Sequence, residues 1–142
     1  MTPIEMQIVH IQARLFENAS YLPSAEFAKS FMRSYIAEQM DRKYSFMQYC
    51  GEEYLLEAFL DGGEIGNEGE RYSPDIMFWM GYIYRYWHYL TGENSRDILK
   101  QAPPEIIRQT YGGLHTLDPA LAVENLKSLS KQRRIEKTGK KR

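Results

Sequence analysis

Apolar residues recur at intervals of three or four along most of this chain, a spacing that is typical of amphipathic helices. The first apolar face, expected on a helix over residues 3–19, consists of Ile4, Ile8, Ile11 and Leu15. Thr2 and Glu5 are spaced as a capping box, and Pro3 occupies the first helical position, where its missing N–H costs nothing. The sequence therefore defines the start of the first helix locally.

Two further helices are predicted before the middle of the chain. Ser24 follows a break at Pro23 and can cap a helix over residues 24–43, whose apolar face consists of Ala28, Phe31, Tyr35 and Met40. The next helix has two faces: Leu55, Leu56, Phe59 and Leu60 on one, and Glu52, Glu53 and Glu57 on the other. The glycine-rich and acidic stretch DGGEIGNEGE, residues 61–70, then predicts a mobile surface loop.

The most aromatic helix is predicted over residues 74–90, between a cap at Ser73 and a stop at Gly92. It carries two stripes of residues at helical spacing. The first consists of Ile76, Met80, Ile83 and Trp87, and the second consists of Phe78, Tyr82, Arg85 and Tyr89. A helix that is apolar nearly all round has neighbours on several sides. We therefore expect this helix at the centre of the core, with Met80, Ile83, Tyr84 and Trp87 buried.

Shorter helices are expected over residues 95–101, 104–111 and 119–130, with Gly112 and Gly113 ending the second of them. No stretch alternates apolar and polar residues with the period of a strand. The predicted fold is all-α: a single compact domain of about five to seven helices over residues 1–130, around a central aromatic-rich helix.

Composition and charge narrow the class of protein. A chain of 142 residues with 43% apolar and 26% charged residues is typical of one soluble globular domain. Cys50 is the single cysteine, so no internal disulfide can form, and the N-terminus lacks the pattern of a signal peptide. Charged residues interrupt every apolar stretch before the roughly twenty residues that a membrane span needs. We expect a cytoplasmic protein that does not enter a membrane.

The charge is distributed unevenly. Residues 1–130 hold eleven basic and eighteen acidic side chains, whereas residues 131–142 hold seven basic side chains against Glu136 alone. The basic residues of this segment are Lys131, Arg133, Arg134, Lys137, Lys140, Lys141 and Arg142. Because the segment has one strong apolar residue, Ile135, we expect a flexible tail that can contact nucleic-acid phosphates.

Metal and catalytic motifs are not recognisable. Taken in EF-hand register from Asp61, the acidic loop has Gly63 and Ile65 where oxygen ligands belong. The histidines and Cys50 lie in separate elements without the spacing of a zinc site, and the acidic residues after Cys50 oppose a reactive thiolate. The sequence predicts no metal, no cofactor and no catalytic residue.

Two groups of residues are candidates for binding a partner. On the central helix, Arg85 with Tyr82, Tyr86 and Tyr89 can present a planar donor and stacking surfaces, although the same residues also suit a core helix. In the linker YGGLHTLDP, Tyr111, His115 and Thr116 can form a small polar site, or they can satisfy the ends of the adjoining helices.

The stretches WMGYIYRYWHYLTGENSRDI and YGGLHTLDPALAVENL resemble the signature motifs of a family of small uncharacterised bacterial proteins. The genes of that family lie beside genes for ADP-ribosyltransferase-like toxins. The resemblance covers roughly residues 3–128, with the specific motifs in residues 79–126. It implies a toxin–antitoxin or host-defence setting, and it supplies no catalytic residues.

These observations lead to one main hypothesis and two alternatives. The main hypothesis is a non-enzymatic protein–protein interaction module, an antitoxin or accessory component of a toxin–antitoxin or defence-type operon, which buries a Tyr/Arg-rich surface on a protein partner such as a toxin. The first alternative is a nucleic-acid-associated regulator that uses the basic tail. The second is a small enzyme using Tyr111, His115 and Arg85.

Overall fold

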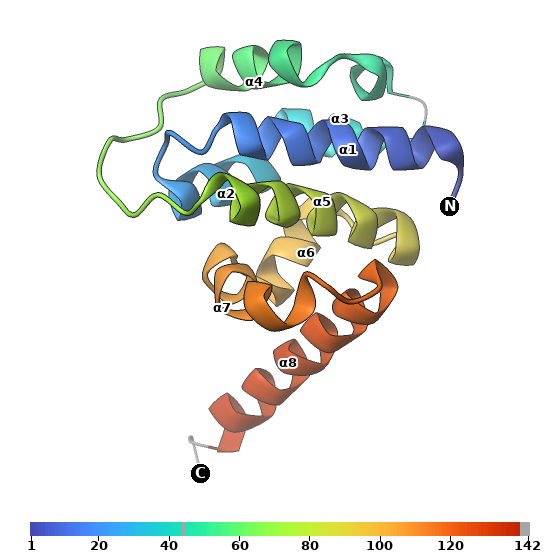
Figure 1. Ribbon diagram of the computed structural model, residues 1–142, viewed down its shortest axis with the longest axis vertical. Helices are drawn as coiled ribbons and strands as arrows, with labels where there is room; N and C mark the ends of the chain where they lie inside the picture. Colours follow the sequence, from blue (N-terminus) through green and yellow to red (C-terminus); the bar gives the residue numbers. More distant parts are fainter. Residues whose placement is uncertain (44, 140–142) are drawn as a thin grey trace.

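The structure of the protein, a computed structural model, describes residues 1–43 and 45–139 (Figure 1). Over these residues the chain forms eight α-helices, one short 3-10 helix and no strand. In chain order the elements are α1 (Pro3–Asn18), α2 (Ser24–Met32), α3 (Tyr35–Asp41), η1 (Phe46–Tyr49), α4 (Glu52–Asp61), α5 (Pro74–Thr91), α6 (Ser95–Gln101), α7 (Pro104–Leu114) and α8 (Pro119–Gly139). The predicted all-α fold is confirmed.

Helices α1 and α5 form the centre of the molecule and pack against each other more extensively than any other pair (Figure 1). Their close approach depends on Gly81, because a Cβ atom at this position would lie 2.6 Å from the Gln12 carbonyl oxygen and 2.9 Å from Phe16 Cβ. The Gln12 side chain also donates from Nε2 to the Gly81 carbonyl oxygen at 3.1 Å. A glycine inside α5 therefore brings the two backbones together.

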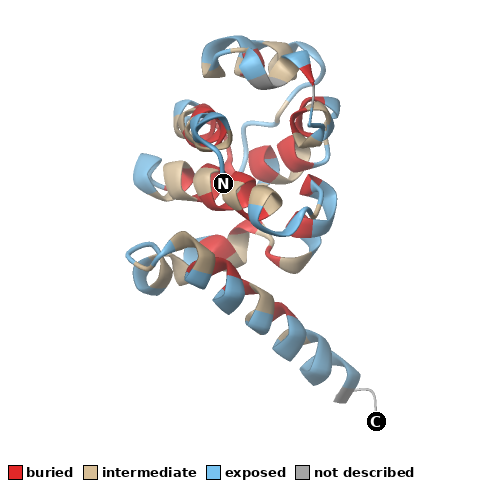
Figure 2. Ribbon diagram, turned by 90° about the vertical axis from the view of Figure 1, so that its right-hand side faces the viewer, coloured by how far each residue is buried: buried red, intermediate tan, exposed pale blue. Residues whose placement is uncertain are grey.

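The expectations for α5 are confirmed. Ser73 caps the helix by accepting from the Ile76 N–H, and Gly92 ends it in the left-handed region at φ 78°. The four residues expected in the core are all buried: Met80, Ile83, Tyr84 and Trp87. Figure 2 shows buried residues concentrated on the central helices, whereas α4 has one buried residue, Leu55, and the far end of α8 is largely exposed.

The helix predicted over residues 24–43 is two helices. Ser34 lies between them in an extended conformation, accepting from the Ala37 N–H at 3.2 Å and donating to the Phe31 carbonyl at 2.7 Å. A serine that bonds the backbone on both sides competes with helix continuation. The break turns Tyr35, predicted to face the core, into an exposed residue, and it accounts for eight helices in place of seven.

The C-terminal half differs from prediction at two places. α7 continues through Gly112 and Gly113 to Leu114, and α8 continues past Ser130 to Gly139. Residues 131–139, expected in a flexible tail, are thus helical, because extending a helix already nucleated by residues 119–130 costs far less than starting one. Lys140, Lys141 and Arg142 lie outside the described residues.

No described helix combines the length and the apolar character needed to cross a bilayer. Within the described residues, no three His, Cys, Asp or Glu side chains come together in an arrangement that could hold a metal ion.

Candidate functional site

Arg85, the proposed polar anchor of the binding surface, is completely buried. Its guanidinium has three side-chain partners: Nε donates to Gln12 Oε1 at 2.8 Å, Nη1 to Asp41 Oδ1 at 2.6 Å, and Nη2 to Ser95 Oγ at 3.3 Å. Asp41 has two further hydrogen bonds, because it also accepts from the Ser95 N–H at 2.8 Å and the Ser95 hydroxyl at 2.7 Å. The four residues form a closed polar cluster, here called the Arg85 cluster.

The Arg85 cluster joins four helices, since Gln12 lies in α1, Asp41 ends α3, Arg85 lies in α5 and Ser95 begins α6. Because the guanidinium is completely buried, it cannot reach a partner protein without unfolding of the site. The expectation that Arg85 reaches an acidic side chain is met, whereas its assignment to a binding surface is corrected. Its role in this structure is to fix helix packing.

His88 lies one turn after Arg85 and borders the same cluster. Its Nδ1 lies 2.6 Å from the Glu93 carbonyl oxygen and 3.7 Å from Asp41 Oδ1. Burial lowers the pKa of His88, and the nearby positive charge of Arg85 lowers it further, while hydrogen bonds to the backbone and the Asp41 charge partly oppose this. The imidazole is therefore held neutral at pH 7, donating to the Glu93 carbonyl.

Two tyrosines of α5, Tyr82 and Tyr86, stack their rings on one side of the helix. Tyr82 and Tyr86 stack at 6.0 Å between centroids with an 11° angle, and His10 meets Tyr82 edge-on at 5.5 Å. All three rings are partly buried. Tyr89 is also partly buried, and its hydroxyl is a buried oxygen without a hydrogen-bond partner. These tyrosines act first as packing groups between α1 and α5.

The linker candidates form a second, separate group. The rings of Tyr111 and His115 stack at 4.1 Å, and His115 Nδ1 lies 2.5 Å from the Tyr111 carbonyl oxygen. His115 thereby satisfies the end of α7, one of the two roles considered for it, while Thr116 is exposed. Tyr111 contacts α5 through Trp79, at 5.8 Å between ring centroids. The linker group therefore contacts Trp79, a residue that the sequence analysis missed. The polar contacts of Arg85 are to other residues, Gln12, Asp41 and Ser95.

A different surface has the exposed aromatic residues. Of the aromatic side chains described in the segment from α3 to α4, four are more than half exposed: Tyr35, Phe46, Tyr49 and Tyr54. Phe46, at 72% exposure, is the most exposed of them. Aromatic side chains are enriched at protein interfaces, and an apolar ring gains most from burial when it starts in water. This segment was missed because Tyr35 fits a core stripe and Phe46 belongs to no periodic pattern.

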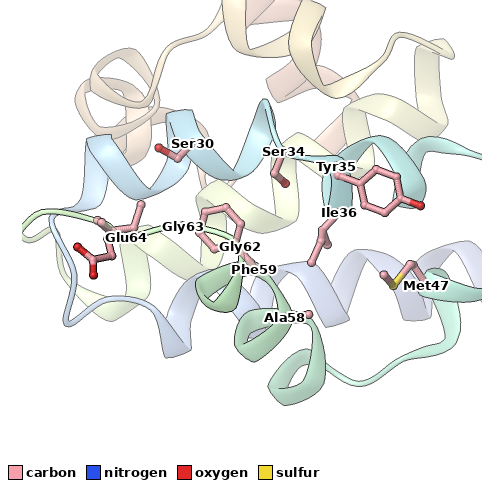
Figure 3. Close-up of a pocket in the computed structure, with 11 residues that line it drawn as sticks. Ser30, Ser34, Tyr35, Ile36, Met47, Ala58, Phe59, Gly62, Gly63 and Glu64 are labelled. Carbon is pink, nitrogen blue, oxygen red and sulfur yellow. The ribbon is translucent and has the colours of Figure 1, made fainter.

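A groove lies beside these residues, between α4 and the α2–α3 pair (Figure 3). We call it the α3–α4 groove; it has a volume of about 490 Å³ and its lining includes Tyr35, Ile36, Met47, Ala58, Phe59 and Glu64. A second groove of about 560 Å³ shares Tyr35 and Met47 with the first, and its other lining residues are Gln39, Arg42, Lys43, Ser45 and Phe46. Tyr35 and Met47 thus lie where two concave surfaces meet.

The α3–α4 groove exists because α4 is held at few points. Leu55 is the buried residue of α4, and Phe59 packs edge-on against Phe27 and Phe31 of α2, each at 5.5 Å. At the start of α4, Arg14 Nε pairs with Glu52 Oε1 at 2.9 Å. Glu57, Asp61 and Glu64 are exposed along α4 and the loop after it. The groove is therefore apolar inside and acidic along one edge.

Comparison with protein families, with curated proteins and with solved structures found no match to this chain.

Proposed function

We propose that the protein is a protein–protein interaction module that works in the cytoplasm as an antitoxin or accessory component of a bacterial toxin–antitoxin or defence-type operon. The observation that carries the binding role is the pair of adjoining grooves that share Tyr35 and Met47, with Phe46 exposed beside them. The operon setting rests on the motif resemblance. The surface differs from the one predicted, since the Arg85 cluster is buried.

The chemistry of the groove indicates the kind of partner. An apolar side chain of the partner would fill the space between Ile36, Met47 and Phe59, where it loses contact with water. Basic side chains on the α4 side of that anchor would meet Glu64 and the other acidic groups at the edge, whereas Arg42 and Lys43 in the second groove would not favour them. The proposed partner is thus a protein with an apolar anchor flanked by lysine or arginine, which fits the idea that an acidic protein masks a basic surface of a toxin.

The proposal assigns binding rather than catalysis to this chain. The alternative enzyme hypothesis needs Arg85 beside Tyr111 and His115. The guanidinium of Arg85 is engaged by Gln12, Asp41 and Ser95, and the His115 ring is stacked on Tyr111 at the end of α7. A shared site for these three residues has no support in these contacts.

The test is capture of the partner from the native cell with tagged wild-type chain and two matched variants. Phe46→Ser removes an aromatic group of the proposed surface, and Ile135→Ser removes an equally exposed apolar group, 72% in both cases, from the far end of α8. We expect a stoichiometric protein partner that is lost with Phe46→Ser and kept with Ile135→Ser, with equal melting temperatures for all three chains.

Two results would contradict the proposal. One is a partner that Phe46→Ser and Tyr35→Ser retain, and the other is the absence of any stoichiometric protein partner. The antitoxin role has its own readout: the captured protein, expressed alone, should arrest growth, and co-expression of this chain should relieve the arrest unless it carries Phe46→Ser. Binding without relief of growth would limit the function to that of an accessory protein.

A further inference from the structure

One face of helix α8 is mainly apolar in its first half and basic in its second half. The face that packs on the body of the protein consists of Ala122, Val123, Leu126 and Ser130, all buried. Continued at the same helical spacing, this face carries Arg133, Arg134 and Lys137. The apolar stripe is thus replaced by a basic one toward the end of α8, which projects from the body (Figures 1 and 2).

Opposite this basic stripe lies the end of α6. Together the two helices enclose a cleft of about 390 Å³, lined by Lys100, Gln101, Ser130, Arg133, Arg134 and Lys137. We call it the α6–α8 cleft. Four of its six lining residues are cations and none is acidic. The nearest ion pair, between Lys100 Nζ and Asp97 Oδ1 at 4.0 Å, is highly exposed and therefore weak. Positive charge in the cleft is left largely uncompensated.

The cleft is held open in a defined geometry. Arg133 Nη2 donates to the Gln101 carbonyl oxygen at 2.7 Å, which ties α8 to the end of α6. Six residues earlier on α8, Lys127 pairs with Glu93 Oε1. The other oxygen of Glu93 accepts a hydrogen bond from the Gln101 side chain. Arg133 is thereby a positioning residue. Among the described residues, Arg134 and Lys137 have no ion pair within 4.0 Å, so their charges remain available to a ligand.

We propose that the α6–α8 cleft binds the phosphate backbone of a nucleic acid without reading its sequence. Guanidinium and ammonium groups spaced along a concave surface suit successive phosphates. The cleft has no aromatic lining, so base stacking does not contribute to recognition. Because residues 1–130 carry an excess of seven acidic charges, a polyanion is repelled by most of the body and directed to this end of the molecule.

An anionic membrane fits the cleft less well. A helix that lies on a membrane needs a broad apolar face, and on the projecting part of α8 the one exposed large apolar residue is Ile135. Helix α4 and the projecting end of α8 lie at opposite ends of the molecule (Figures 1 and 2), and the α3–α4 groove and the α6–α8 cleft share no lining residue, so the two proposals can succeed or fail separately.

The experiment measures fluorescence anisotropy of the full chain with a labelled single-stranded RNA and a labelled duplex DNA, each of about 20 nucleotides per strand, over about 50 to 200 mM salt. Lys100→Gln tests the cleft from α6, outside the basic C-terminal segment. Lys131→Gln is the matched control, because it removes the same charge from an exposed position of α8 that does not line the cleft. All variants should keep the wild-type melting temperature, since both lysines and Arg134 are exposed.

We expect the double variant Lys100→Gln/Arg134→Gln to bind roughly tenfold more weakly at low salt, with the slope of log affinity against log salt reduced by about 0.7 to 0.9 per lost cation. Lys131→Gln should change affinity less than about twofold. Equal losses for Lys100→Gln and Lys131→Gln would overturn the site, because they would show a diffuse charge effect. Binding to phosphatidylcholine vesicles with about 30% phosphatidylserine, but to neither nucleic acid, would overturn the ligand class, and so would no binding at all.

Discussion

Neutralising Asp41 is expected to destabilise the fold more than neutralising any exposed carboxylate, because Asp41 is the one acidic partner of the fully buried Arg85. In Asp41→Asn, the new amide nitrogen must replace one of two oxygens. Replacing Oδ1 would place it against Arg85 Nη1, now 2.6 Å from that oxygen, and replacing Oδ2 would place it against the Ser95 N–H, now at 2.8 Å. Both neighbours are donors, so either orientation loses a hydrogen bond.

Two effects set the loss of unfolding free energy: a buried donor without an acceptor, and a buried charge without its partner. A buried donor left without an acceptor costs about 1–3 kcal/mol. Removing one partner of a buried ion pair leaves an uncompensated charge, and the total is about 3–5 kcal/mol. Exposed ion pairs contribute a median of about 0–1 kcal/mol. The matched control is therefore Glu52→Gln, which neutralises the Arg14–Glu52 pair, whose side chains are 43% and 24% exposed.

The assay is urea unfolding followed by tryptophan fluorescence and circular dichroism, for the wild type, Asp41→Asn, Glu52→Gln and the double variant Asp41→Asn/Arg85→Met. Removing both charges should recover part of the loss, because no buried charge remains unpaired. The reasoning would be refuted if Asp41→Asn cost no more than Glu52→Gln. It would also be refuted if the double variant lost the full sum of the two single changes.

Two more predictions test the packing and the buried histidine. Gly81→Ala should destabilise the fold by about 1–3 kcal/mol, because the new Cβ would overlap the Gln12 carbonyl. Gly112→Ala has open space around it and should stabilise the fold by about 0.5–1 kcal/mol. Thermal unfolding of both variants checks that the two changes have opposite signs. Burial and the Arg85 charge lower the pKa of His88 in the folded chain. As the pH falls through the pKa of about 6.5 that histidine has in the unfolded chain, the unfolded chain takes up the proton first, and the stability of the fold decreases. His88→Gln should flatten the pH dependence of the unfolding free energy between about pH 7 and 5.5, and an unchanged profile would contradict this assignment.

Local features of the fold could be read from the sequence. The Thr2–Glu5 capping box is present, and Ser73 and Gly92 bound α5 as predicted, because each involves residues within four positions of one another. The apolar stripes of α5 placed the central helix correctly, since a helix with no polar face must be covered on several sides.

The tertiary structure decided which polar groups meet. Arg85 lies 44 residues from Asp41 and 73 from Gln12, so nothing in the local pattern distinguishes a buried anchor from an exposed one. Lys100 joins the basic face of α8 only because α6 packs beside it. Tyr35 faces solvent because one serine breaks the helix before it, and α8 continues because its first turns are already anchored to the body. The caps at Thr2 and Ser73 and the stop at Gly92 depend on neighbouring residues and can be read from a single sequence, whereas the length of α8, the binding surfaces and the buried charges depend on how the helices are packed together.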